Sequence, residues 1–345
     1  MNVLGIDTSC DDTAVAVVAD GRVIRSSIVA SQQGLHAEHG GVVPEVASRR
    51  HLEAIRPALE RALVEASVTL DEIDLVAATV GPGLAGSLMV GYNLGRALAL
   101  GRRRPFAPVN HLEGHIYSAW LIASEPSEPA PALPLLVLIV SGGHTELVLM
   151  RDHGVYQRLG GTRDDAAGEA FDKVGRLLGL DYPGGPAIQR AAAALPEGVE
   201  PVTLPRAWMR GGYDFSFSGL KTAVLHLVRE RQPRLDSTQL DSTQVDAIAA
   251  GFQDSVADVL ATKTAAAARE YDVRGVALCG GVAANSTIRE RLWRALPAGT
   301  PFHVPPPHLC TDNAAMIAAA GYYRRSGAIE PAASGDIQPG LALPV

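Results

Sequence analysis

Residues 3–20 read VLGIDTSCDDTAVAVVAD, and residues 135–152 read LLVLIVSGGHTELVLMRD. Each stretch has an apolar run, a turn of small polar residues and a second apolar run, which predicts a β-hairpin with a turn longer than two residues. A second correspondence follows, because residues 75–100 and residues 275–296 both read as a strand, a glycine loop and a helix. Together the two correspondences predict a duplicated α/β fold with two related lobes.

The join between the two halves is predicted at ASEPSEPAPALP, residues 123–134, where proline, serine and glutamate replace the apolar periodicity. We therefore expect an N-terminal lobe over residues 1–128 and a C-terminal lobe over residues 129–325. Residues 326–345 have little helix or strand pattern, and for them we expect a loose C-terminal tail.

The composition is that of a globular protein, with 47% hydrophobic residues in a chain of 345, enough for two cores. The longest apolar run, Leu135 to Val140, is far shorter than a membrane span. No basic, apolar leader precedes Asp7, and three cysteines are too few for a disulfide framework. We therefore expect a cytoplasmic protein without a membrane partner. The net charge of −7 argues against a generic nucleic-acid-binding surface.

Residues 110–115 read NHLEGH, which places two histidines four positions apart. On a helix, His111 and His115 share a face and can both bind one metal ion. On this hexapeptide alone, two satisfied structural histidines are the better interpretation. The pattern also differs from the H-E-x-x-H of zinc proteases, because Glu113 lies two residues after His111, about 200° around the helix. A thermolysin-like mechanism is therefore disfavoured.

A third metal ligand is available in TDN at residues 311–313, which opens an apolar helix. Asp312 would be an ordinary helix cap in most proteins, but with two histidines it would complete a two-His-one-carboxylate set with open positions. The sequence alone does not bring the three residues together, and His36, His39 and His308 remain rival ligands.

Several glycine loops could hold a phosphate group. GPGLAG at 81–86 matches G-x-G-x-x-G, but no acidic residue follows about 20 positions later, so we interpret it as a tight strand-to-helix turn. Four other loops can grip a phosphate chain with backbone N–H groups. They are residues 7–13, 141–145, 183–185 and 280–285. Asn285 could be a helix N-cap or could bond a ribose or base. Together these loops favour a nucleotide in a cleft between the lobes.

Taken together, the motifs resemble those of tRNA N6-adenosine threonylcarbamoyltransferases, the bacterial TsaD family once labelled glycoproteases. The matching stretches run in order from residue 5 to residue 318, and such a series is highly specific. They are GIDTSCDDTAVAVV, HGGVVPEVASRRH, GPGLAGSLMVG, NHLEGH, VSGGHTEL, GEAFDKVGRLLGLDYPGGP, FSFSGLKTAV, GGVAAN and TDNAAMIA.

The resemblance implies an actin-like, sugar-kinase-like (RNase H-like) fold of two lobes with the nucleotide between them. It implies transfer of the threonylcarbamoyl group from threonylcarbamoyl-AMP to N6 of the adenosine 3′ of the anticodon, in tRNAs reading codons that begin with A. It also implies His111, His115 and Asp312 as ligands of one Fe²⁺ per subunit, with Zn²⁺ as the alternative ion. The residues implied to hold the adenylate, or ATP or AMP, are Ile139, Val140, Ser141, Gly142, Gly143, Asp172, Gly185 and Asn285.

The partners implied by the resemblance are tRNA, a non-catalytic paralogue (TsaB-like) and a small ATPase (TsaE-like). Help in tRNA capture fits the acidic net charge, since phosphate neutralisation dominates such binding. The apolar helix over residues 84–100 is a candidate for the interface with the paralogue, although a core helix fits it equally well.

The implied reaction needs no covalent Ser or Cys nucleophile, because AMP is a good leaving group in a mixed carbamic–phosphoric anhydride. We assign Asp11 to proton transfer or positioning, with capping of the turn as its structural alternative. Two positions depart from the relatives: Asp7 stands where many have glutamate, and Gln189 stands where several have an acid, so Gln189 is left out of the site. The rival functions are an ATP-dependent kinase or ATPase of the same fold and, less well supported, a metalloendopeptidase.

Overall fold

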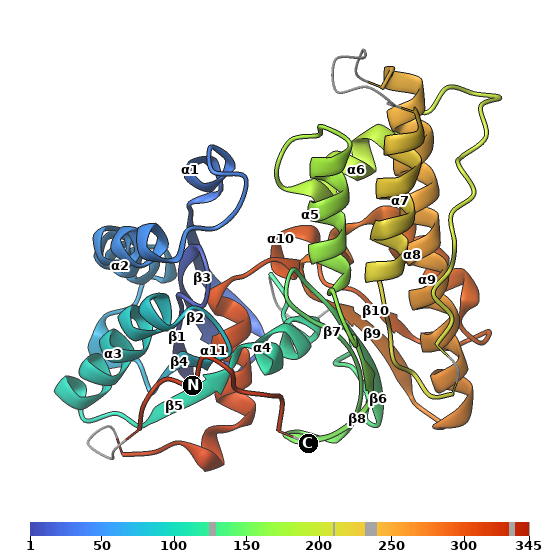
Figure 1. Cartoon of the computed structure of the whole chain (residues 1–345). Coiled ribbons are helices and arrows are strands. Elements are labelled where there is room, and N and C mark those ends of the chain that lie inside the picture. The colour runs from blue at the N-terminus through green and yellow to red at the C-terminus, as the bar shows by residue number, and fades with distance from the viewer. Residues whose placement is uncertain (124–128, 210, 232–239, 331–334, 345) are drawn as a thin grey trace. The chain divides into compact units, whose positions relative to one another are not determined.

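The computed structural model describes residues 1–123, 129–209, 211–231, 240–330 and 335–344 (Figure 1). The chain forms two compact units. The first contains Met1–Ala132, Met150–Tyr156 and Pro305–Val345, and the second contains Leu133–Leu149 and Gln157–Val304. The first change of unit lies close to the predicted join, of which residues 124–128 are outside the described residues. The division differs from the expected one, because the chain returns to the first unit from Pro305 onward.

The first unit is built on a five-stranded sheet in the order β3-β2-β1-β4-β5. Its strands are β1 (Asn2–Asp7), β2 (Asp12–Ala19), β3 (Val23–Ser31), β4 (Leu75–Gly81) and β5 (Phe106–Asn110). β2 is antiparallel to β1 and β3, whereas β1, β4 and β5 are parallel. The carboxyl ends of three strands therefore meet at one edge of the sheet, and they end at Asp7, Gly81 and Asn110.

Helices cover both faces of this sheet, which is why its central strands are almost continuous runs of buried Val, Ile, Leu and Ala. Gly91 of α3 approaches Ile6, whereas Ala314 of α11 approaches Gly5, and consecutive strand residues face opposite sides. Helices α2 and α3 thus cover one face, and α11 with α4 covers the other. The helices of this unit are α1 (Gln33–Ala37), α2 (Pro44–Ala66), α3 (Ala85–Arg102), α4 (His111–Tyr117), α10 (Pro307–Cys310) and α11 (Ala314–Tyr323).

The second unit has its own five-stranded sheet, in the order β10-β9-β6-β7-β8. Its strands are β6 (Leu135–Val140), β7 (Thr145–Asp152), β8 (Val155–Gly161), β9 (Gly275–Cys279) and β10 (Phe302–His303). Its helices are α5 (Ala167–Leu177), α6 (Gly184–Ala193), α7 (Ser218–Arg231), α8 (Ser242–Glu270) and α9 (Ser286–Ala295). The long helix α8 packs against three other helices of this unit, α6, α7 and α9.

The two sheets have the same topology, as the sequence predicts. Reading each sheet from its hairpin edge gives β3-β2-β1-β4-β5 in one unit and β8-β7-β6-β9-β10 in the other. The first strand of each unit is parallel to the strand that precedes the glycine loop and helix, so β1 pairs with β4 and β6 pairs with β9. Both predicted hairpins and both strand–loop–helix elements are confirmed.

The C-terminal tail is not loose where the structure describes it. Residues 335–344 lie against the first unit, and the side chain of Leu343 is only 3% exposed. Hydrogen bonds join Gln338 to Val80 and Gly83 to Pro339. The expectation failed because backbone hydrogen bonds to loop residues leave no helix or strand periodicity in the sequence. Among the described helices, none is both long and apolar enough to cross a membrane.

Candidate functional site

The motif NHLEGH forms the end of β5 and the first turns of α4. Asn110 is the N-cap of this helix, and its side-chain oxygen accepts a hydrogen bond from the backbone N–H of Leu112. Gly114 allows close packing, because a Cβ at this position would lie 2.7 Å from the side chain of Ile317 on α11. The glycine therefore lets α4 lie directly against α11, and both histidines face the start of that helix.

Asp312 lies in the short segment between α10 and α11. The N-cap of α11 is Asn313, whose side chain accepts from the backbone N–H of Met316, so Asp312 is not the cap. Gly5 of β1 permits this arrangement, since a Cβ there would lie 2.1 Å from the carbonyl oxygen of Ala314. The carboxylate of Asp312 is left to face the two histidines.

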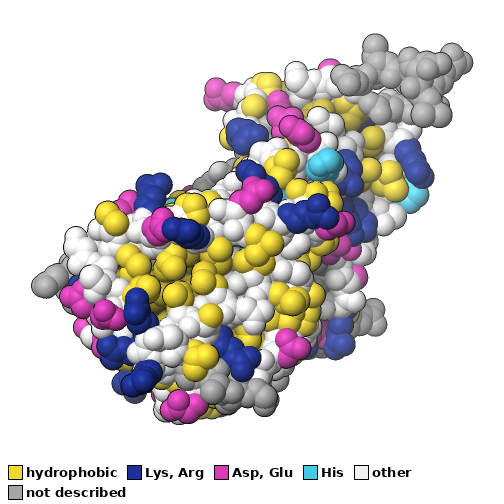
Figure 2. Space-filling view, turned by 90° about the vertical axis from the view of Figure 1, so that its left-hand side faces the viewer, with side chains coloured by type: hydrophobic (Ala, Val, Ile, Leu, Met, Phe, Trp, Pro, Cys, Tyr) yellow, Lys and Arg dark blue, Asp and Glu magenta, His cyan; other side chains and the backbone are white. Residues whose placement is uncertain are grey.

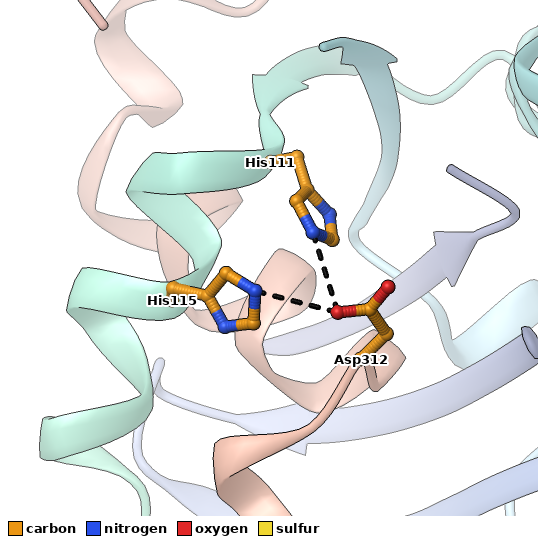
Figure 3. Close-up of side chains that lie close together, drawn as sticks. All are labelled: His111, His115 and Asp312. Atoms are coloured by element: carbon orange, nitrogen blue, oxygen red, sulfur yellow. Dashed lines mark ion pairs between the residues drawn. The ribbon is translucent and has the colours of Figure 1, made fainter. Parts of the chain in front are cut away.

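The structure brings His111, His115 and Asp312 together (Figure 3). The Oδ1 atom of Asp312 lies 3.4 Å from Nε2 of His111 and 3.3 Å from Nε2 of His115. Two atoms that are each about 2.1 Å from one ion at a tetrahedral angle lie roughly 3.4 Å apart. The two distances to Asp312 therefore match those between neighbouring ligands of one small cation, and all three ligand atoms lie within 4.8 Å of one another.

The unsatisfied nitrogen atoms of this group support the same conclusion. Both ring nitrogens of His115 and the Nδ1 atom of His111 are buried without a hydrogen-bond partner among the described residues. Buried polar atoms are normally paired, so such a cluster indicates a missing ligand. The residues present fit a divalent ion that accepts nitrogen and oxygen ligands and leaves positions open for substrate, as in two-His-one-carboxylate sites.

The ionisable side chains of this group shift one another's pKa values. Burial alone would raise the pKa of Asp312, but His111 and His115 outweigh it and hold this pKa well below the usual range. Burial would lower the pKa of His111, whereas Asp312 and Asp7 raise it well above the ordinary value. The carboxylates thus favour positive charge at this position, which a bound cation would supply.

Asp7 is a member of the site that the sequence did not assign to it. Its side chain is buried, and it accepts hydrogen bonds from Thr79 Oγ1 at 2.6 Å and from the backbone N–H of Ser9 at 3.2 Å. Its Oδ2 atom lies 3.5 Å from Nδ1 of His111, the ring nitrogen that faces away from Asp312. A carboxylate in this place can fix the orientation of a ligating imidazole. The resemblance flagged position 7, but only the fold brings it to His111.

Glu113 faces away from the cluster, as its position on the helix predicts. Its carboxylate forms an ion pair with Arg324 and is 5% exposed. Burial raises the pKa of Glu113, while Arg324 opposes this shift. A glutamate held in this way cannot act as the general base beside an ion bound by His111 and His115.

Cys10 and Asp11 lie in the turn that follows β1. Burial raises the pKa of the Cys10 thiol, and the carboxylates of Asp11, Asp312 and Asp7 add to the shift. This thiol is therefore not a nucleophile at neutral pH. His51 on α2 supports the turn, because its Nε2 atom lies 3.0 Å from the carbonyl oxygen of Cys10. The turn brings Asp11 to the same edge of the sheet as the cluster.

The rival ligands are not part of any metal-binding group among the described residues. His36 is fully buried, and its Nδ1 atom accepts from the backbone N–H of Val43. His39 and His308 are exposed on the surface.

In the second unit, the turn between β6 and β7 offers an open stretch of backbone. Ser141 closes the turn with a backbone hydrogen bond to the carbonyl oxygen of His144 at 2.8 Å. Among the described residues other than its chain neighbours, no atom lies within 4 Å of a Cβ built on Gly142 or on Gly143. Ile139 and Val140 are buried in β6 and hold the start of the turn. The N–H groups of this turn can thus be approached by a ligand.

Two other glycines of this unit bring neighbouring loops against the turn. A Cβ on Gly168 would lie 2.5 Å from the carbonyl oxygen of Ser141, and one on Gly280 would lie 2.4 Å from that of Val140. The start of α5 and the GGVAAN loop are therefore packed on the turn backbone to backbone. This places two of the predicted loops, residues 141–145 and 280–285, beside the start of α5 within one unit.

Two of the three remaining predicted residues, Asp172 and Asn285, have hydrogen-bond partners inside the protein. Asp172 accepts from the backbone N–H of Gly184 at the start of α6, and burial raises the pKa of its carboxyl group. Gly185 has open space around it. Asn285 is the N-cap of α9, because its side-chain oxygen accepts from the backbone N–H of Ile288, and its Nδ2 donates to Gln253 at 2.7 Å. Of the two roles expected for Asn285, the structure therefore shows the helix cap. Gln189 lies beside it and accepts from the backbone N–H of Ser286.

A duplicated mixed sheet with a His–His–carboxylate group defines a two-lobed, actin-like α/β protein that can hold a metal ion. Solved structures agree on the fold. The chain is similar to HypF of T. kodakarensis, with a TM-score of 0.61 and 14% identity over 94% of this chain and 48% of that one. It is also similar to component A of (R)-2-hydroxyglutaryl-CoA dehydratase from Acidaminococcus fermentans, with a TM-score of 0.53, 16% identity, and 94% and 99% of the two chains covered.

Sequence comparison identifies the family. Residues 23–319 match the family described as TsaD, tRNA N6-adenosine threonylcarbamoyltransferase. The chain is 52% identical to the protein of that name from Thermomicrobium roseum, over 99% of this chain and 97% of the relative. It is 48% identical to the one from Bacillus subtilis, with 99% and 96% covered. The chain belongs to the tRNA N6-adenosine threonylcarbamoyltransferase family.

Proposed function

We propose that this protein transfers the threonylcarbamoyl group from threonylcarbamoyl-AMP to N6 of the adenosine 3′ of the anticodon, in tRNAs reading codons that begin with A. The observation that carries the proposal is the group formed by the buried His111 and His115 with the partly exposed Asp312, in a chain of this family. A kinase of the same fold needs no such group, and the position of Glu113 on Arg324 disfavours a metalloendopeptidase. The site of action is the cytoplasm, where the tRNA substrate is available.

The metal ligands are His111, His115 and Asp312, with Fe²⁺ as the resident ion and Zn²⁺ as the alternative. The bound ion would supply Lewis-acid polarisation of an oxygen of the donor. Asp7 orients His111 through the contact between Oδ2 and Nδ1. Thr79 and Ser9 in turn hold the carboxylate of Asp7 in place.

The adenylate is held by the loops of the second unit. The N–H groups of Gly142 and Gly143 face the phosphate, and the open space at both glycines supports this assignment. Ser141 closes the turn, because its own N–H donates to the carbonyl oxygen of His144. Gly185 leaves room for the nucleoside. Asp172 and Asn285 act through the helix starts that they hold, since both are engaged with neighbouring residues. Ile139 and Val140 anchor the phosphate turn in the sheet.

In the transfer step, N6 of adenosine forms a bond to the carbamoyl carbon, and the bond from this carbon to the phosphate oxygen breaks. AMP leaves with the electron pair, and one proton leaves the attacking amine. Asp11 is our candidate for accepting or positioning this proton, because it lies in the turn after β1 near the cluster. An exocyclic adenine amine is a weak nucleophile, so orientation must supply much of the rate.

The partners proposed for this reaction are tRNA, a non-catalytic paralogue and a small ATPase. The paralogue would dock on the face formed by α2 and α3, where hydrophobic side chains gather between Arg residues (Figure 2). A groove of about 570 Å³ lies between these helices and is lined by Leu52 and Met89, which are 66% and 52% exposed. An exposed apolar groove between two helices fits the apolar face of a partner helix.

The interface is tested with Leu52→Glu and Met89→Glu in mixtures with the paralogue, followed by sedimentation velocity. Each change should abolish or strongly weaken the complex, because a charge would be buried in the groove. Val64→Glu is the matched control, since Val64 is on the same helix and 77% exposed but does not line the groove. Normal pairing by both groove variants would exclude this face as the interface.

The activity is tested by supplying threonylcarbamoyl-AMP and a substrate tRNA to the metal-loaded protein with its partners. One AMP should appear for each modified adenosine, measured by chromatography of nucleotides and by mass spectrometry of tRNA nucleosides. Conversion of ATP to ADP with phosphate on an acceptor would identify a kinase, and cleavage of polypeptide would identify a protease. Release of AMP without modified adenosine would refute the transferase.

A further inference from the structure

The C-terminal segment, residues 335–344, forms backbone contacts with the loops that end two strands of the first sheet. Gln338 donates its N–H to the carbonyl oxygen of Val80 at 2.7 Å, and Gly83 donates to Pro339 at 3.1 Å. A Cβ at Gly81 would lie only 1.9 Å from the carbonyl oxygen of Gln338. The segment is therefore in direct contact with the GPG loop after β4.

The same segment reaches the metal-binding helix through one amide group. Asn110 accepts from the backbone N–H of Leu112 through Oδ1 at 2.8 Å, and it donates from Nδ2 to the carbonyl oxygen of Ala342 at 2.9 Å. The bond to Ala342 fixes which way the amide points and so keeps the oxygen on the helix. His111 is the residue between this cap and the capped N–H group.

A second route leads from the segment to the carboxylate beside His111. The loop at Gly83, which donates to Pro339, lies against the backbone of Ser9, with a distance of 2.4 Å from a Cβ on Gly83 to the Ser9 carbonyl oxygen. The N–H of Leu84 donates to the same oxygen at 2.8 Å. Ser9 in turn donates its N–H to Asp7, whose Oδ2 faces His111.

Hydrophobic side chains hold the segment in place. Leu343 is 3% exposed, and Ile337 and Leu341 pack against the core of the first unit. Burial of these apolar side chains helps to keep the segment attached to the first unit.

We propose that residues 335–344 form a positioning strap that holds the metal-binding helix and the Asp7 turn in register with Asp312. The inference rests on the proposed metal centre. The strap acts through Asn110 and Gly83 and contributes no ligand of its own. Detaching it should leave the ligands present but less well ordered, so that both the metal affinity and the geometry of coordination change.

The test uses Leu343→Asp in the full chain, because a buried charge would detach the end of the strap. Co²⁺ is the probe, since its visible absorption reports both affinity and ligand geometry. We expect the Co²⁺ affinity to fall at least tenfold and the absorption bands to shift. Hydrogen exchange of the metal-free protein should be faster over residues 110–118, where the cap on Leu112 is weakened. Leu343→Ala should give the same changes at smaller size and serves if the aspartate variant does not fold.

Two further variants separate positioning from general stability. Leu70→Ala removes a side chain that packs against the same core. It should lower the melting temperature without changing the Co²⁺ spectrum. Leu343→Met, which keeps an apolar side chain of similar size, should bind Co²⁺ with near-normal affinity. Unchanged Co²⁺ affinity and spectrum in both Leu343→Asp and Leu343→Ala would refute the strap and leave the metal centre standing. Absence of Co²⁺ binding by the unmodified protein would overturn both.

Discussion

The two hairpin turns occupy the same place in the two sheets, yet they are built for opposite chemistry. The turn after β1 carries the buried carboxylate of Asp7, which is engaged by Thr79 and Ser9 and lies beside His111. The turn after β6 carries Gly142 and Gly143, with no side chain and no neighbouring atom within 4 Å of either Cβ position. One copy of the fold thus presents a side chain suited to a cation, and the other presents backbone suited to an anion.

The glycines at the two candidate sites differ in the same way, although each unit also contains glycines of the other kind. In the first unit, Gly5 and Gly114 are needed because a Cβ would collide with α11, so they serve close packing. In the second unit, Gly142, Gly143 and Gly185 have open space, so packing does not require them. A glycine that packing does not require is the better indication of a ligand.

The largest effect should come from removing one of the metal ligands of the first unit. His115→Ala should lower metal affinity by more than a hundredfold and abolish transfer, because a two-residue site holds a divalent ion weakly. The fold should persist, since the side chain makes no hydrogen bond with the described residues. Mass spectrometry measures the loss of metal, and circular dichroism checks that the fold persists.

Glu113→Gln is the matched control on the same helix. Its partner Arg324 is 40% exposed and can remain hydrated, so the cost to activity should be severalfold at most. Full metal loading of His115→Ala, combined with an inactive Glu113→Gln, would reverse our assignment of the two faces of α4.

The second-largest effect concerns the other turn. Gly143→Val should weaken AMP binding at least tenfold in calorimetry, because a branched side chain would fill the space assigned to phosphate. Metal binding should be unaffected, which separates the functions of the two turns. Gly101→Val is the control, since Gly101 also has open space but lies at the end of α3. Equal AMP affinity in the folded Gly143 variant would remove the turn from the site.

Asp7→Asn should produce an intermediate effect. The amide can still accept from Thr79, but it no longer places a negative charge beside Nδ1 of His111. Loss of such an outer carboxylate typically lowers metal affinity by 10- to 100-fold. A Co²⁺ titration measures the change, and an affinity within twofold of the unmodified protein would show that Asp7 only supports the turn.

Local sequence patterns were enough to predict the secondary structure around the site, but not the position of Asp312. The hairpins and the strand–loop–helix elements were predictable, because periodicity of apolar residues encodes them locally. The pairing of His111 with His115 was likewise local, since four positions is one helical turn. The resemblance implied Asp312, but no local pattern brings it to the histidines, because its approach depends on Gly5 and Gly114 permitting contact with α11.

Other features had no signal in the sequence. The contact of Asp7 with His111 depends on the order β1-β4-β5, which places the ends of β1 and β5 at one edge. The tail over residues 335–344 is held by backbone hydrogen bonds, which every residue type can form, and by the apolar side chains of Ile337, Leu341 and Leu343. Three apolar residues in so short a stretch give no clear helix or strand pattern. Asn285 reads as cap or ligand from sequence, and only the position of Gln253 decides how its amide is used.

The smallest effect is expected at Asp12, which shares a turn with Asp7 but differs from it in its partners. The Oδ1 atom of Asp12 is buried without a hydrogen bond among the described residues. Burial raises the pKa of Asp12 to about 6, a hydrogen bond from Ser31 opposes the shift, and the neighbouring carboxylates add to it. An unfolded aspartate has a pKa near 3.9, so the folded protein binds the extra proton between about pH 4 and pH 6.

This excess of bound protons sets the sign of the effect on stability. Folding stability falls as pH rises through that window, because the folded state must ionise a poorly solvated carboxyl group. Asp12→Asn cannot ionise and should therefore be more stable than the unmodified protein above pH 7, by roughly 3 kcal/mol. The advantage should shrink to about 1 kcal/mol at pH 4.5, because most of the shift lies between pH 4 and pH 6. Melting temperatures of the metal-free proteins between pH 4.5 and 8 test this, with Glu65→Gln as an exposed control that should change little. A constant difference at all pH values would mean that Asp12 is not the group that titrates, and the contrast between the two carboxylates of this turn would then lie in packing and not in charge.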